Sequence, residues 1–412
     1  MTQLLAGVRV VEVAVLLNGS TASMHLADLG ADVIKVESPA PGDYLRFGHT
    51  GHLHAQVNKG KRSVVLDLKS EAGREALGRL VSTADVFVTN VLGPSLASLG
   101  ITYEQLRAHR EDLVYCQVTG FGGTGPYAPV PAHGQMMDAV AGTIPTETGP
   151  DGLARMARPP AVRSGSLSVA GEATSMSAVF AAFHICAALA HRARTGRGCV
   201  IDVSAADAAF ASAWTSVVSR LNLPEERQWW LRPDAGEHGA RYQVYLAADG
   251  RYLMFCPEER KFWERFCLLA DRPDLLERTS GYELRAEIQR IIGARGSAEW
   301  MKLAIEHRLP LAPVNDGVAE VAADPQVRSR GVLQTFPGPD GRDYTGVRQP
   351  ALIDGQACEP PSPAPALGEH TREVLAELGY DEARQSVFAM RAEPADGYII
   401  ADAQGADEGS GS

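Results

Sequence analysis

The sequence has few cysteines, and none has the close spacing that disulfide frameworks and zinc sites use. No two of them form a Cys-x-x-Cys pair. The pattern therefore favours neither a small disulfide scaffold nor a zinc knuckle. We expect these residues to be buried thiols in a reducing compartment. They are Cys116, Cys186, Cys199, Cys256, Cys267 and Cys358.

Excess positive charge and long apolar runs are also missing. The formal net charge is −11, whereas a nucleic-acid surface needs a basic stripe. The N-terminal stretch MTQLLAGVRVVEVAVLL has neither the basic start nor the small-residue cleavage site of a signal peptide. No apolar run is interpreted as long enough to span a membrane. We therefore expect a cytoplasmic protein that binds neither nucleic acid nor membrane.

What the chain does have is enough apolar sequence for one large core or two smaller ones, with 412 residues of which 45% are hydrophobic. Its first half alternates β-branched runs with amphipathic stretches. Strands are expected over residues 8–14, 31–37, 62–68, 85–90 and 113–122, and helices over 19–30, 70–84 and 102–110. Strands that alternate with helices predict a mostly parallel sheet covered on both faces. We expect residues 1–205 to begin a large Rossmann-like α/β domain.

The composition changes after residue 205. A hairpin is expected over residues 241–256, with its turn at 248–250, and helices over 259–270, 283–294 and 297–308. These elements predict a smaller α+β domain at 206–330. Residues 331–392 are expected to return to the large domain and end in a helix at 372–379. The acidic tail, residues 393–412, is expected to be disordered.

The glycine-rich segment GFGGTG, at residues 120–125, formally matches a dinucleotide-binding motif. That motif needs a helix directly behind the glycines, but Pro126 and two further prolines follow here. We therefore reject a nicotinamide site. Gly122 and Gly123 instead leave room for a ligand to approach the backbone.

Two polar clusters lie before the third predicted strand. His49, His52 and His54 occur within six residues, but no carboxylate or thiolate partner is fixed beside them, so a polar loop is favoured over a metal site. The segment NKGKRS, at residues 58–63, carries three cations. It is either a solvated basic turn or a clamp for phosphate groups, and the residues alone leave both interpretations open.

Two further segments contain candidate acid–base groups. His133 lies beside Gly134 in a turn, where it is either structural or a general base. Asp138 follows five residues later and need not face it. Glu172 is the single carboxylate among small residues just before an apolar helical run at 177–190. A helix-start acid is the simpler interpretation of Glu172, and a catalytic carboxylate is the alternative.

Several long segments occur here in the order in which a known family has them. The strongest are LADLGADVIKVESPAPGD, NKGKRSVVLDLKS, TGFGGTGPYA, RTGRGCVIDVS and LGEHTREVLAELGY. To about residue 385 the chain resembles the family III CoA-transferases, the CaiB/BaiF family, which includes formyl-CoA transferase and α-methylacyl-CoA racemase. The resemblance implies a Rossmann-like large domain, a smaller second domain and a homodimer of interlocked chains.

The resemblance also implies a catalytic aspartate in the stretch that SVAGEATSM matches, where it forms a mixed anhydride with the acyl group. Ala170 or Gly171 stands at that place here, so Glu172 becomes the candidate. His133 lies where the family's racemases have their catalytic histidine, although Gly134 replaces the aspartate that follows it there. Asp138 is the third catalytic candidate.

Coenzyme A, bound as an acyl-CoA, is the implied substrate, and no metal is implied. Leu92 and Ser98 stand where the family often has basic residues that hold the CoA phosphates. The candidate CoA-binding residues are therefore Lys35, Asn58, Lys59, Lys61, Arg62, Asn90, Gly122 and Gly123.

Three functions follow from these residues. A transferase would use Glu172 as a nucleophile and divide CoA transfer into two easier steps. A racemase would use His133 and Glu172 to exchange an α-proton without a covalent bond. A family member that has lost catalysis would bind an acyl thioester or a related ligand. Trp229, Trp230 and Trp263 are candidates for an acyl pocket, although core or interface positions are commoner for tryptophan.

Overall fold

The computed structural model describes residues 3–47, 50–157, 172–224, 239–338, 341–358 and 362–388. His49, Ala170, Gly171, Trp229, Trp230 and the predicted acidic tail lie outside these ranges. The chain divides into two compact units. The larger contains the described residues up to 157, those from 172 to 212 and those from 326 onward, and the smaller contains residues 213–325. The boundaries of the smaller unit that we predict from the sequence are residues 205 and 330.

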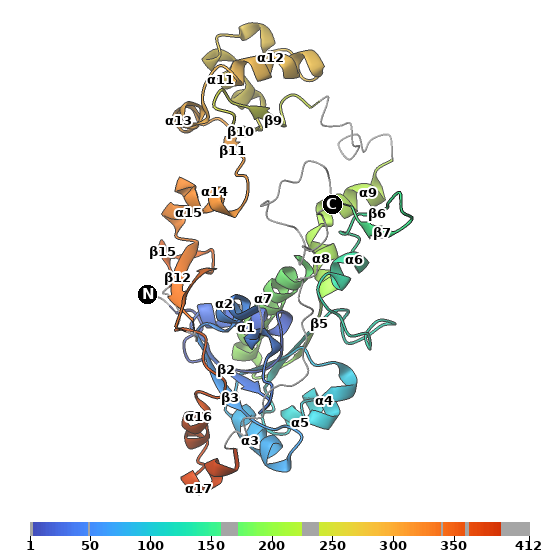
Figure 1. The fold of residues 1–412 in the computed structure, drawn as a ribbon, viewed down its shortest axis with the longest axis vertical. Helices are drawn as coiled ribbons and strands as arrows, with labels where there is room; N and C mark the ends of the chain where they lie inside the picture. Colours follow the sequence, from blue (N-terminus) through green and yellow to red (C-terminus); the bar gives the residue numbers. More distant parts are fainter. Residues whose placement is uncertain are drawn as a thin grey trace, which may run out of the picture. The chain divides into compact units, whose positions relative to one another are not determined.

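The larger unit is built on a six-stranded sheet in which every neighbouring pair is parallel (Figure 1). The spatial order is β3-β2-β1-β4-β5-β8. The strands are β1 (Arg9–Val13), β2 (Asp32–Glu37), β3 (Lys61–Val65), β4 (Val86–Thr89), β5 (Val114–Thr119) and β8 (Val200–Ser204). Most of their residues are buried, as the continuous β-branched runs in the sequence require of a sheet covered on both faces. The predicted α/β class is confirmed.

Two layers of helices bury the two faces of this sheet. Because neighbouring strand residues point to opposite faces, Val11 packs with one layer and Val10 with the other. The first layer contains α3 (Glu71–Ser82), α4 (Gly93–Leu99), α5 (Tyr103–Arg107) and α16 (Thr371–Glu377), and the second contains α1 (Asn18–Asp28) and α7 (Glu172–Thr195). Each buried valine or leucine stabilises this arrangement by about 1.5–3 kcal/mol. Ser70 caps α3 as predicted, with its side chain accepting a hydrogen bond from the Gly73 amide.

Helix α7 is long and apolar enough to cross a membrane by length and composition alone. The expectation that no segment reaches that length was therefore wrong. In the larger unit, however, α7 packs against α1 and the sheet through Ala178, Ala181 and Ile185, which are all fully buried. These contacts are those of a core helix.

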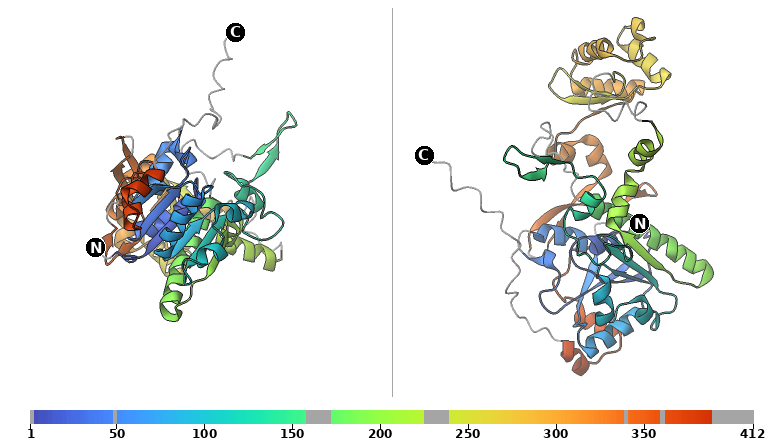
Figure 2. Two further views of the ribbon diagram at one scale, coloured as in Figure 1. Left: turned by 90° about the horizontal axis from the view of Figure 1, so that it is seen from below. Right: turned by 90° about the vertical axis from the view of Figure 1, so that its right-hand side faces the viewer.

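The larger unit also contains short helices and two-stranded hairpins, which lie beyond the carboxyl ends of the sheet strands and in the C-terminal segment. They are α2 (Gly51–Asn58), α6 (Met136–Val140), α8 (Ala205–Ser212), α15 (Pro325–Arg330) and α17 (Glu382–Gln385), with the hairpins β6 (Thr146–Thr148) with β7 (Ala154–Met156), β12 (Leu333–Pro337) with β13 (Asp343–Val347), and β14 (Leu352–Ile353) with β15 (Gln356–Ala357). Figure 2 shows the C-terminal segment, in orange and red, running beside the first strands of the sheet. Backbone hydrogen bonds help to hold it there, from the Gly60 amide to the Ser362 carbonyl and from the His370 amide to the Ser63 carbonyl.

The smaller unit packs helices on a three-stranded antiparallel sheet of order β11-β10-β9. The predicted hairpin is present as β9 (Gln243–Leu246) and β10 (Tyr252–Phe255), with Gly250 at φ 79° in its turn. The other elements are α9 (Trp214–Asn222), α11 (Arg260–Leu269), α12 (Tyr282–Ile292), α13 (Ser297–His307), β11 (Leu311–Pro313) and α14 (Val318–Ala323). Trp263 is 1% exposed and stacks on Phe266 in the core of this unit. It therefore does not line an acyl pocket there.

Candidate functional site: two cavities in the larger unit

The first cavity lies where the carboxyl ends of the central strands meet. The chain runs from β1 outward to β3 and then crosses back to β4 on the other side of β1, so β1 and β4 form the switch point of the sheet. Open α/β sheets bind ligands at such a point. A hollow of about 180 Å³ is present there, lined by segments that follow β1, β2, β3 and β4. Its lining residues are Val13, Ala14, Val15, Val36, Glu37, Ser38, Gly42, Leu66, Asp67, Leu68, Lys69, Val91 and Leu99.

One cation in this hollow was not singled out from the sequence. Lys69 is exposed, follows the end of β3 by four residues, and has no ion pair among the described residues. Lys69 could have been identified from the sequence, because it follows directly after the carboxyl end of a predicted strand. Asn90, in contrast, does not face the hollow as a free polar group. Its side chain bonds both the amide and the carbonyl of Val15, so it holds the loop after β1 in place.

Lys35 and Lys61 belong to a buried ion network beneath the sheet edge. The Lys35 Nζ lies 2.6 Å from Glu12 Oε1 and 2.9 Å from Asp43 Oδ2. The Lys61 Nζ lies 2.7 Å from Glu12 Oε2 and also bonds Asn58 Oδ1 at 3.0 Å. Because these ammonium groups are buried and satisfied inside the fold, the interpretation of Lys35, Asn58 and Lys61 as CoA-binding residues is not supported.

The same network sets the protonation of its members. Burial alone would raise the pKa of Glu12, but the ammonium groups of Lys35 and Lys61 outweigh it and hold that pKa well below its usual range. Burial would likewise lower the pKa of Lys35, but Glu12 and Asp43 raise it above its ordinary value. Burial prevails at Lys61 and lowers its pKa to about 8. Glu12 therefore stays charged between two buried lysines.

The remaining cations of the predicted phosphate clamp are also occupied. Lys59 is fully buried with its Nζ 2.6 Å from Asp28 Oδ1. The Arg62 guanidinium is bonded to Asp32 at 2.7 Å and to Glu377 at 2.6 Å. The sequence placed three cations together but did not reveal the carboxylates that pair with them from elsewhere in the chain. Each cation of the predicted clamp is thus paired with a carboxylate in the fold, and phosphate binding by these residues stays a prediction.

The histidine cluster and the glycine-rich segment also take structural roles. His52 and His54 lie on helix α2, not in a loop, and burial lowers the pKa of His54 to about 4, with the charge of Arg46 adding to the effect. The described residues contain no group of three His, Cys, Asp or Glu side chains that could hold a metal ion.

The glycine-rich segment follows β5 and is tied to β8. The Gly123 amide donates to both carboxylate oxygens of Asp202 at 2.9 Å. Gly122 has φ 82°, and a Cβ there would lie 3.4 Å from the Ser204 Cβ. The segment is thus held against the strand, and the Gly123 N–H is not free to stabilise an oxyanion.

A second cavity, of about 610 Å³, lies between α1, α2, the start of α7 and the C-terminal segment. All of its lining residues belong to the larger unit. They are Leu17, Thr21, Met24, His25, Asp28, Gln56, Val57, Gly134, Gln135, Thr174, Ser175, Val179, Val347, Arg348, Gln349 and Pro350. The volume lies within the range of about 300–1,000 Å³ that small-molecule sites occupy. We refer to it below as the α1–α7 cavity.

The α1–α7 cavity brings together the segments that carry two predicted catalytic residues. Gly134 and Gln135, directly after His133, form part of one wall, and Thr174 and Ser175, shortly after Glu172, form part of another. His133 and Glu172 are themselves exposed. Glu172, Ser175 and Val179 have the spacing i, i+3, i+7 and so share one face of α7, and the last two of them line the cavity.

Asp138, the third predicted catalytic residue, has a different position. It is 1% exposed, and its Oδ1 accepts a hydrogen bond of 3.1 Å from the Ala173 amide in the first turn of α7. A carboxylate in that position satisfies an unpaired helix amide and complements the helix dipole. Asp138 therefore fixes the start of α7 relative to α6 and acts on the cavity through that helix.

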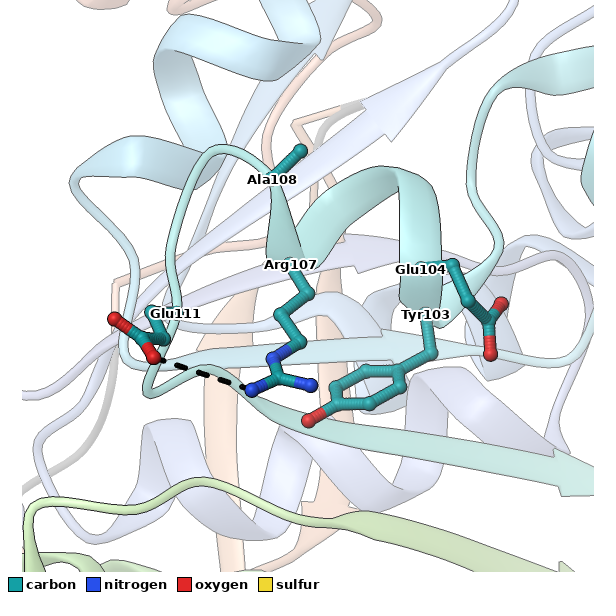
Figure 3. A pocket seen from close by; sticks show the side chains of 5 residues that line it. All are labelled: Tyr103, Glu104, Arg107, Ala108 and Glu111. Carbon is teal, nitrogen blue, oxygen red and sulfur yellow. Dashed lines mark ion pairs between the residues drawn. The ribbon is translucent and has the colours of Figure 1, made fainter.

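A third, open hollow lies on the surface of α5 and the turn after it (Figure 3). Tyr103, Glu104, Arg107, Ala108 and Glu111 line it, and Arg107 forms an ion pair of 4.0 Å with Glu111. All five residues come from one short stretch of chain, and the only cation among them is already paired. We assign no binding role to this hollow.

Comparison with known proteins decides between the classes of function. Residues 5–371 match the family model for CoA-transferase family III. The chain is also 33% identical over 400 residues to the succinate–glutarate CoA-transferase of Agrobacterium fabrum, and the match covers 91% of this chain and 95% of that protein. The chain belongs to CoA-transferase family III.

Further relatives agree with this assignment. The succinyl-CoA:mesaconate CoA-transferase of Haloarcula marismortui is 32% identical over 406 residues, covering 90% of this chain and 96% of that protein. A solved structure of a CaiB/BaiF family protein from Brucella suis has a TM-score of 0.69 and 30% identity, covering 92% of this chain and all of that one. This family III CoA-transferase is therefore an enzyme that transfers CoA between an acyl-CoA and a carboxylic acid.

Proposed function

We propose that this enzyme transfers CoA to and from dicarboxylic acids at the α1–α7 cavity, with Glu172 as the attacking carboxylate. The dicarboxylate class is supported by the names of the relatives, which act on succinate, glutarate and mesaconate. The position of Glu172 carries the proposal for the nucleophile. It is an exposed carboxylate on the cavity-lining face of α7, at the N-terminal end where the helix dipole stabilises negative charge.

The reaction balances without a metal or an added proton. A Glu172 oxygen attacks the thioester carbon, the carbon–sulfur bond breaks, and CoA leaves as a thiolate beside a mixed anhydride. The thiolate then attacks the Glu172 carbonyl carbon, which releases the donor acid and leaves CoA on the enzyme. The acceptor carboxylate reverses these two steps and departs as the new acyl-CoA. Covalent catalysis of this kind replaces one difficult exchange by easier ones.

The other two predicted catalytic residues support Glu172 in this proposal. Asp138 is a positioning residue, because it bonds the amide that immediately follows Glu172. His133 lies in the turn whose next two residues line the cavity, and its imidazole can donate or accept a hydrogen bond there. Neither residue is needed as a nucleophile.

The switch-point hollow is the proposed site for part of the CoA. Its volume of about 180 Å³ is too small for the whole cofactor, so the hollow takes one end while the remainder extends over the surface. Lys69 provides a cation at this hollow without a carboxylate partner among the described residues. The backbone of the glycine-rich segment, at Gly122, is a further candidate contact.

The proposed working form is a cytoplasmic homodimer. Large apolar side chains are exposed on α7 and α8, among them Phe183 at 64% and Phe210 at 50%. Helix α9 has no buried residue and exposes Leu221 at 77%. Exposed apolar side chains of this kind favour an interface, and a second copy is the partner that the family resemblance implies. Light scattering on the purified protein tests the dimer.

The nucleophile is tested by trapping the covalent intermediate. The enzyme is incubated with succinyl-CoA, digested, and searched by mass spectrometry for an acyl or CoA adduct on the peptide that contains Glu172. We expect the adduct in the wild type and its loss in Glu172→Gln. Glu71→Gln is the matched control, because Glu71 is also an exposed first residue of a helix. An adduct that persists in Glu172→Gln would exclude Glu172.

We propose racemisation of 2-methylacyl-CoA as a second activity to be tested beside CoA transfer, because the turn after His133 and the start of α7 flank the same cavity. Two groups on opposite sides of an α-carbon are what a proton exchange needs. Incubation of a 2-methylacyl-CoA in deuterated water separates the two activities. Exchange at the α-carbon that is lost in His133→Gln, without any adduct on Glu172, favours the racemase.

A further inference from the structure

Arg348 is a buried cation that has no carboxylate partner in the part of the chain that the structure describes. It lines the α1–α7 cavity and is 6% exposed. Its guanidinium donates to three backbone carbonyls, those of Arg330, Gly331 and Gln349. No carboxylate within the described ranges forms an ion pair with it.

The other buried cations of the larger unit show how unusual this is. Lys35, Lys59 and Lys61 each have a carboxylate oxygen within 2.7 Å. A buried charge without such a partner is costly, and carbonyl dipoles offset that cost only in part. A guanidinium has five N–H donors in a planar fork, and its three bonds to carbonyls leave two donors unassigned. Arg348 is therefore prepared to receive an anion.

The remaining charges around the cavity do not supply that anion. Asp28 is already bonded to Lys59 at 2.6 Å. Burial lowers the pKa of His25, and Lys59 and Lys61 add to this effect against the opposing charge of Asp28. Because Lys59 neutralises Asp28, Arg348 is the charged lining residue that has no ion-pair partner among the described residues. Its other wall residues include Leu17, Met24, Val57, Val179 and Val347, which suit a short hydrocarbon chain.

We propose that Arg348 binds the carboxylate at the far end of a dicarboxylic acid and so determines the enzyme's preference for such acids over monocarboxylic acids. The inference rests on the proposed function, because it assumes that the acid occupies the α1–α7 cavity. One carboxylate of the acid takes part in the exchange at Glu172, and the other accepts hydrogen bonds from the two unassigned donors. The planar fork of arginine matches a carboxylate better than a lysine ammonium does.

The test compares glutarate with valerate, which has the same number of carbon atoms and a methyl group in place of the far carboxylate. The ratio of kcat/KM for the two acceptors is measured in wild type, Arg348→Met and Arg348→Lys. We expect Arg348→Met to lower the glutarate-to-valerate ratio by about 10- to 100-fold, the usual effect of a charge-assisted hydrogen bond. Arg348→Lys should lower it less. A ratio that is unchanged in Arg348→Met would overturn the inference.

A control variant and a binding measurement distinguish failure of the inference about Arg348 from failure of the proposed function. Arg241→Met is the matched control, because Arg241 donates to a backbone carbonyl in the smaller unit and should leave the ratio unchanged. Calorimetric titration with glutarate measures binding without turnover. A wild type that binds glutarate but transfers no CoA would refute the proposed function while supporting Arg348, provided that Arg348→Met loses this binding. Equal binding by both proteins would refute the role of Arg348.

Discussion

Replacing Glu12 by glutamine removes the negative charge that two buried lysines share. Lys35 would keep Asp43 at 2.9 Å, whereas Lys61 would keep only neutral acceptors, the Ser20 carbonyl at 2.9 Å and Asn58 Oδ1 at 3.0 Å. One ammonium group is therefore left without a counter-charge. Breaking a buried ion pair in this way costs about 3–5 kcal/mol.

Deprotonation of Lys61 sets an upper limit on the free-energy cost of Glu12→Gln. Lys61 can become neutral instead of staying charged, and at pH 7 releasing a proton from a group with an ordinary pKa of 10.5 costs about 5 kcal/mol. We therefore expect Glu12→Gln to lower the free energy of unfolding by about 3–5 kcal/mol. Urea denaturation followed by circular dichroism measures it. Ser23→Ala removes one hydrogen bond to Glu12 but no charge, and should cost about 1.5–3 kcal/mol, as expected for a hydrogen bond to a charged group. A loss below 1 kcal/mol in Glu12→Gln would refute the reasoning.

Three other predictions concern single groups. Because the pKa of Lys61 falls to about 8 on folding from 10.5, wild-type stability from this group rises between pH 8 and 10.5, and Lys61→Met should lack that rise in urea titrations. The pKa of His54 falls from 6.5 to about 4 on folding. Its contribution to the free energy of unfolding is therefore present above pH 6.5 and is lost as the pH falls through 4. We expect the free energy of unfolding of His54→Gln to fall less steeply than that of the wild type over this pH range. Lys69→Ala should raise the KM for succinyl-CoA by about fivefold at unchanged kcat, whereas Lys302→Ala, which also removes an exposed lysine, should change neither constant.

The central sheet was predictable because its signals are local. Continuous β-branched runs such as residues 8–14 and 31–37 gave strands close to their observed limits, and Ser70 marked the start of a helix. Helix α2 was not predictable in the same way. Its sequence, GHLHAQVN, has no cap and little apolar periodicity, and it is stabilised by packing through Leu53 and Val57. Tertiary contacts outweigh weak local preference at such places.

The candidate site was harder to predict because its contacts join distant parts of the chain. Lys59 and Arg62 looked like free cations until the fold placed Asp28 and Glu377 beside them. Arg348 had no recognisable motif, and its proposed role depends on having no carboxylate partner among the residues that the structure describes. The segments around His133 and Glu172 both contribute to the wall of the α1–α7 cavity, although only residues adjacent to these two line it. Their roles remain predictions.

The C-terminal segment has a consequence for how the protein is made. The edge of β3 is completed from the end of the chain, where the Thr371 side chain accepts a hydrogen bond from the Val65 amide 306 residues earlier. Helix α16 also closes one of the two cores of the sheet. A ribosome adding about 5–20 residues per second needs about 15–60 s to synthesise that interval. During synthesis, the edge of β3 therefore stays exposed until the C-terminal segment has been made. We expect this exposed edge to favour aggregation during translation.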